Sequence, residues 1–123
     1  MENIRTVDLV ALRASPDRSA QRLLDRASGG TSCQISCVKT PPGSGSPEGL
    51  HTHDVDQIFY VLEGTMSIEV DGRTREAGPG SLIVFPAGVP HRNWNGGHEA
   101  TLHLAIAAPL PDAGTPFAKP VKA

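Results

Sequence analysis

The sequence predicts an all-β domain of the sandwich or barrel type, and three observations support this class. Thirteen glycines and eleven prolines are many for 123 residues, which favours frequent turns over long helices. From residue 32 onward, short apolar or alternating segments are separated by turn residues. The length and the 38% hydrophobic content are those of one folded domain that can bury a genuine core.

The individual strands follow from this pattern. In 65–70, Met66, Ile68 and Val70 alternate with polar residues, as in a strand with one buried face. Asp71 and Gly72 then form a strong hairpin signal. On the same grounds we expect strands at 31–39, 50–53, 57–62, 65–70, 73–76, 81–85, 91–94 and 100–107.

The two ends of the chain are expected to lie outside a barrel that spans 32–107. In the N-terminal extension, 1–31, the run Ser15-Pro16-Asp17 resembles a helix start. Leu23 and Leu24 fit that helix, but 22–25 also fits an edge strand, and the sequence leaves both open. The C-terminal segment, 108–123, is rich in proline and is expected to form an extended tail.

Charge and hydropathy exclude several classes of function. Eleven basic residues against thirteen acidic ones give a net charge of −2, which disfavours nucleic-acid binding. No apolar run is long enough to span a membrane, and the charged start shows no secretory signal, so a cytoplasmic location is expected.

The two cysteines, Cys33 and Cys37, are expected to be reduced. On one strand their Cα atoms would lie about 13 Å apart, beyond the roughly 7 Å that a disulfide allows. We therefore expect two free thiols and no metal or redox role.

Three histidines and one glutamine form the main candidate site. His51 and His53 are two residues apart, so on a strand both rings face the same way and can bind one ion. Gln57 shares their parity at the start of an apolar strand. His91 follows the rigid segment 86–90, which would fix where its ring emerges. The alternative is that these histidines are exposed loop residues.

Two segments resemble the sequence motifs of the cupin family. Residues 45–64 fit G-x5-H-x-H-x3-E-x6-G except that Gln57 stands where the family usually has Glu. Residues 80–95 fit G-x5-P-x-G-x2-H-x3-N at every fixed position. The short gap between the motifs is typical of small single-domain bacterial cupins, and the resemblance covers roughly 32–107.

The resemblance implies a double-stranded β-helix, the jelly-roll barrel of the cupins. It also implies one divalent metal ion, with His51, His53, Gln57 and His91 as ligands. The donor types do not distinguish Zn, Ni, Fe, Mn and Co. Many such cupins pair through edge strands, so a homodimer is expected.

Gln57 shapes the expected chemistry. A neutral amide compensates less of the metal's charge than a carboxylate, which strengthens Lewis acidity toward a small keto, enol or sugar-acid substrate. We therefore expect isomerisation, cyclisation, elimination or ring-opening. An Fe(II)-dependent dioxygenase and a non-catalytic small-molecule-binding cupin are the alternatives.

Further residues are candidates for the wall of a substrate pocket. Arg92 and Asn93, beside His91, are candidates for contact with an anionic substrate. Phe59, Met66 and Trp94 are also candidates, although residues of these types more often belong to the core. His103, which alternates with Leu102 and Leu104, is either a pocket-lining residue or a surface residue.

Overall fold

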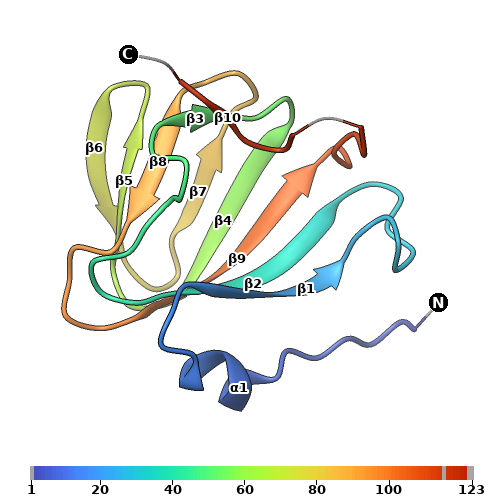
Figure 1. Cartoon of the computed structure of the whole chain (residues 1–123), viewed down its shortest axis with the longest axis horizontal. Coiled ribbons are helices and arrows are strands. Elements are labelled where there is room, and N and C mark those ends of the chain that lie inside the picture. Colours follow the sequence, from blue (N-terminus) through green and yellow to red (C-terminus); the bar gives the residue numbers. More distant parts are fainter. Residues whose placement is uncertain (1, 115, 122–123) are drawn as a thin grey trace.

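The computed structural model describes residues 2–114 and 116–121 and places the strands in two facing antiparallel sheets (Figure 1). The all-β class is thereby confirmed. The first sheet has the order β1 (Ser19–Leu24), β2 (Gln34–Thr40), β9 (Thr101–Ala108), β4 (Asp56–Glu63) and β7 (Leu82–Phe85). The second has the order β10 (Lys119–Pro120), β3 (His51–Thr52), β8 (His91–Trp94), β5 (Met66–Val70) and β6 (Arg73–Ala77). No helix in the described ranges is long and apolar enough to cross a membrane.

The main core lies between the sheets, where one face of each strand points inward. On β5 the alternation predicted from the sequence is present, because Met66 and Ile68 are buried. Phe85 of β7 is fully buried and its ring meets that of Phe59 edge-on at 4.9 Å. This apolar packing fills one half of the barrel and leaves the other half for polar side chains.

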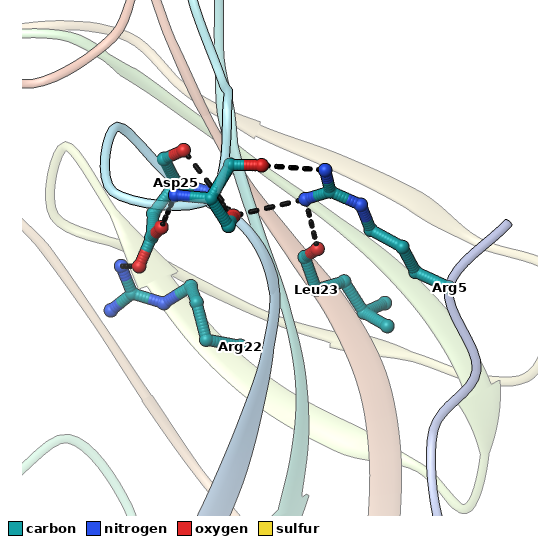
Figure 2. Close-up of polar contacts among 5 residues, drawn as sticks. Arg5, Arg22, Leu23 and Asp25 are labelled. Atoms are coloured by element: carbon teal, nitrogen blue, oxygen red, sulfur yellow. Dashed lines mark hydrogen bonds and ion pairs between the residues drawn. The ribbon is translucent and has the colours of Figure 1, made fainter. Parts of the chain in front are cut away.

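The N-terminal segment forms an edge strand rather than the alternative helix. Residues 19–24 pair with β2, with an irregularity between Arg22 and Leu24. The helix interpretation of 15–27 is therefore wrong, because the backbone groups of that segment bond to a neighbouring strand. Arg5 anchors the preceding chain by donating to the carbonyl oxygen of Leu23 at 2.9 Å (Figure 2).

A short helix, α1 (Leu9–Ala14), precedes β1 and was not predicted. Asp8 caps it by accepting a hydrogen bond from the amide of Ala11 at 3.1 Å. Its one buried residue, Leu12, packs with Cys37 and Leu102 on the outer face of the first sheet. Six residues are too few to show a helical period in the sequence, so this helix depends on its packing against the sheet.

Both cysteines are free thiols. Cys33 lies just before β2, which begins three residues later than expected, so the two thiols do not share one strand as predicted. Cys37 is buried beneath α1, and this desolvation raises the pKa of its thiol.

The C-terminal segment does not remain a simple tail. It returns to the second sheet, where Lys119 and Pro120 pair with Thr52 and His51. Figure 1 shows this segment crossing the end of the barrel beside β3. The return brings Phe117 to the polar half of the barrel.

The turn between β4 and β5 depends on glycine, and this predicts a measurable effect. Gly64 has φ of 77°, and a Cβ there would lie 2.6 Å from the carbonyl oxygen of Ala100. Gly80 has φ of 85°, but a Cβ there would meet no atom within 4 Å. Both alanine substitutions lower the free energy of unfolding by about 1 to 2 kcal/mol, because alanine is strained in the left-handed backbone conformation. Only Gly64→Ala adds a clash with the backbone.

We therefore expect urea unfolding to show a lower free energy of unfolding for Gly64→Ala than for Gly80→Ala, by about 2 kcal/mol or more. Equal losses in the two variants would show that the turn relaxes and that the close approach does not matter.

Candidate metal centre

Three buried histidines meet at one end of the barrel, as predicted from their spacing. His51 belongs to β3, His53 follows it directly, and His91 begins β8. His51 and His91 are register partners across these neighbouring strands. The three side chains are at most 5% exposed, and their ligand atoms lie within 4.8 Å of one another. The alternative of exposed loop histidines is excluded.

The backbone fixes the proton on each ring. Each Nδ1 lies within hydrogen-bond distance of a carbonyl oxygen, at 2.7 Å for His51 with Gly49, and at 3.0 Å for His91 with Val89. For His53 the partner is the carbonyl of Phe117, at 2.8 Å. Because a carbonyl only accepts, each Nδ1 must donate, and in the neutral ring Nε2 keeps its lone pair.

Gln57 completes a set of four electron-pair donors. From the start of β4, its Oε1 lies 2.9 Å from Nε2 of His53 and 3.3 Å from Nε2 of His91. These atoms are all acceptors when the rings are neutral, so no proton lies between them. A cation at the point where they converge would relieve their mutual repulsion.

Protonation of the rings does not readily take the place of that cation at neutral pH. Burial lowers the pKa of His91 to about 4, and it also lowers the pKa of His53. At neutral pH the rings of His53 and His91 are therefore neutral. Imidazole nitrogens with one amide oxygen suit a divalent transition metal, so the donor set fits such an ion.

Aromatic rings hold two of the histidines in place. Phe117 stacks on His53 with ring centroids 4.1 Å apart, and Phe85 stacks on His91 at 4.3 Å. Sequence analysis did not identify Phe117, whose only signal is an aromatic residue within a proline-rich segment. Its carbonyl and its ring both contact His53, so the C-terminal segment is part of the centre.

A cavity of about 230 Å³ opens beside the histidines. Of the predicted pocket residues, Phe59 and His103 line this cavity, and Asn93 does so as well. Met66 lies in the apolar core instead. Sequence analysis missed several lining residues, among them Arg18, Ser36, Ala105 and Phe117.

Arg92 and Trp94 belong to the other face of β8. Arg92 forms an ion pair with Glu69 at 2.8 Å, and its guanidinium lies 4.9 Å from the centre of the Trp94 ring. Neither residue lines the cavity described above. Of the two neighbours of His91 considered for substrate contact, only Asn93 is therefore in place.

Comparison with protein families identifies the chain. Residues 37–107 match the model of the cupin domain. The chain belongs to the cupin family. The double-stranded β-helix expected from the sequence is confirmed by a cupin of Methanocaldococcus jannaschii described with that fold, at 16% identity and a TM-score of 0.73. That match covers 90% of this chain and 94% of the other.

Two further solved structures are similar over most of their length. The polyketide cyclase RemF from Streptomyces resistomycificus is 25% identical with a TM-score of 0.75, over 100% of this chain and 87% of that one. A Cupin 2 conserved barrel protein from Salinispora arenicola is 26% identical with a TM-score of 0.70, over 93% and 92% of the two chains.

A curated relative matches by sequence. The polyketide synthase CurC of Streptomyces cyaneus is 29% identical over 89 residues, which are 70% of this cupin and 57% of CurC. This cupin thus spans a little more than half the length of that relative.

Proposed function

We propose that this cupin is a metal-dependent enzyme that acts on a small keto or enol substrate by Lewis-acid chemistry. Among the reactions of this class, ring closure of a polyketide-type substrate is the one we favour. The observation that carries the proposal is the convergence of three histidine Nε2 atoms and one amide oxygen beside a cavity.

The residues of the chain would have different roles in such a site. His51, His53 and His91 would hold a divalent ion, with Gln57 as the fourth ligand. The ion, when bound, would polarise a substrate oxygen and stabilise negative charge on it. Phe117 and Phe85 stack on the ligand rings and limit access of water from their side of the site.

The relatives support cyclisation within this class of reactions. RemF is described as a polyketide cyclase, and CurC as a polyketide synthase. Both names refer to polyketides, and the keto groups of a polyketide suit a Lewis acid that polarises carbonyl oxygens. Cyclisation by this route needs no oxidant.

The experiment is turnover of a linear poly-β-keto thioester by the zinc-loaded protein under argon. Ring closure under these conditions is the expected result. Strict dependence on O2 and Fe(II), with oxygen atoms from O2 in the product, would favour the dioxygenase. Tight binding of the thioester without any turnover would favour the non-catalytic alternative.

The neutral charge of Gln57 leads to a prediction that needs no substrate. Gln57→Glu adds a negative charge to the ligand set, so it should raise the affinity for zinc by about tenfold or more, while Gln57→Leu should lower it. Competition with a chelator of known affinity measures both zinc affinities.

Once a substrate is known, Gln57→Glu should also lower the rate of turnover by about tenfold, because the metal becomes a weaker Lewis acid. Equal zinc affinity in all three proteins would contradict Gln57 as a ligand.

The cytoplasmic location expected from the sequence stays a prediction. We also propose that the protein is a homodimer, as expected from the sequence. Four apolar residues are exposed together on the outer face of β4 and of the edge strand β7, namely Tyr60, Leu62, Leu82 and Val84. The mass in solution, from light scattering, should be that of two chains, and Leu82→Lys should reduce it to that of one.

A further inference from the structure

Buried nitrogen atoms without partners gather at the cavity. Nε of Arg18, Nδ2 of Asn93 and both ring nitrogens of His103 are buried and have no hydrogen-bond partner among the described residues. All three side chains line the same cavity beside the histidines. Buried polar groups are nearly always satisfied, so these nitrogens point to a missing partner.

The chemistry of these nitrogens defines that partner. The Asn93 amide is oriented by Ser46, whose hydroxyl donates to Oδ1 at 2.7 Å, so its Nδ2 is left to donate elsewhere. Arg18 offers N–H groups only, and a neutral imidazole offers one N–H. Three donors from three separate segments require an acceptor, and one of them carries a positive charge.

We propose that Arg18, Asn93 and His103 form a substrate-binding subsite for an anionic oxygen group, a carboxylate or an enolate. This inference rests on the proposed function, because it names the substrate class of the same cavity. The substrate would then be a small keto or enol compound that carries this anionic group at one end and has a second oxygen at the histidine end.

The charges at the cavity agree with an anionic ligand. Arg18 is half-buried and forms no ion pair with any described residue. Desolvation lowers its pKa, and this outweighs the opposing effect of Glu48, a carboxylate that also lines the cavity. An unpaired charge taken out of water is costly, and a bound anion would offset that cost. Arg22 also lines the cavity, but it lies 3.8 Å from Asp25 (Figure 2), so its charge is already shared.

His103 contributes polarity without a charge. It is fully buried against the ring of Phe59, 4.2 Å away, and burial together with Arg18 lowers its pKa to about 3. It therefore stays uncharged, and Arg18 is the cationic group of the three. Its neutral ring is able to donate to one ligand oxygen and accept from a hydroxyl group.

The strand register places His103, at one end of this subsite, away from the metal centre, whereas Asn93 lies two residues from His91 on the same face of β8. Gln57 is the register partner of Ala107, and His103 lies four residues earlier on β9. Four residues of a strand span about 13 Å between Cα positions. His103 and the metal ligands therefore act on different parts of one bound molecule.

The test uses calorimetric titration with a matched pair of probes, 4-hydroxybenzoate and its neutral amide, 4-hydroxybenzamide. Zinc-free wild-type protein should bind the anion about tenfold more tightly than the amide. Arg18→Gln should abolish that preference. Asn93→Asp keeps the acceptor for Ser46 but adds a negative charge, so it should weaken binding of the anion while changing binding of the amide little.

The control is Arg92→Gln, which removes an arginine next to Asn93 on the opposite face of β8. It should keep the preference of the wild type. Equal affinity for the two probes in the wild type, no detectable binding at millimolar concentrations, or a preference that survives in both Arg18→Gln and Asn93→Asp would overturn the proposal. The titration is done without zinc, so it tests the subsite independently of the metal centre. If the metal centre were wrong and the subsite right, the wild-type protein would bind no zinc but would still prefer the anion.

Discussion

The double variant His51→Ala/His91→Ala should lose its metal completely. Wild-type protein dialysed against zinc should retain about one ion per chain, measured by elemental analysis, because four donors converge on one point. Removing two imidazoles from facing strands leaves His53 and Gln57, which are too few to hold zinc against dialysis. Zinc should also raise the melting temperature of the wild type and leave that of the double variant unchanged.

His98→Ala is the matched control, since it removes an exposed histidine. It should retain zinc as the wild type does. An ion that remains stoichiometric in the double variant would contradict the ligand assignment.

The zinc-free protein should lose stability steeply in acid because of His103. Its pKa is lowered to about 3 in the folded protein by burial and by the charge of Arg18, whereas an unfolded histidine titrates near 6.5. Between these values the unfolded chain binds more protons, so the free energy of unfolding falls as the pH falls. The slope from this one residue approaches about 1.4 kcal/mol per pH unit within that window.

His103→Gln should remove that part of the slope. Urea unfolding of the zinc-free proteins between pH 7 and pH 4 measures it, and His98→Gln serves as the surface control. His53 and His91, whose pKa values are also lowered, contribute in the same direction and remain in both variants. If His103→Gln followed the same pH dependence as the wild type, the buried neutral ring would not be what makes the fold sensitive to acid.

The cluster of three histidines was predictable because two of them are close in sequence and the third follows a rigid segment. A spacing of two residues puts His51 and His53 on one face, and the rigid segment before His91 delivers the third ring to the neighbouring strand. The same parity argument could have gone further. Asn93 shares the face of His91, and Trp94 belongs to the opposite one, as the structure shows.

Other features depend on packing between segments far apart in the sequence. Phe117 reaches His53 only because the C-terminal segment pairs with β3. Arg18 reaches the cavity only because the next residues form an edge strand. The period of a strand gives the face of a side chain but not its depth in the barrel. It could not show that Phe59 borders the cavity while Met66, in the same core, does not.

The most direct measurement of the central claim is anomalous X-ray scattering from crystals grown with zinc, with data collected on both sides of the zinc absorption edge. We predict one strong peak per chain, about 2.0 to 2.2 Å from Nε2 of His51, His53 and His91 and from Oε1 of Gln57. Crystals that show no peak among these four atoms, or zinc only at surface residues, would contradict the metal centre.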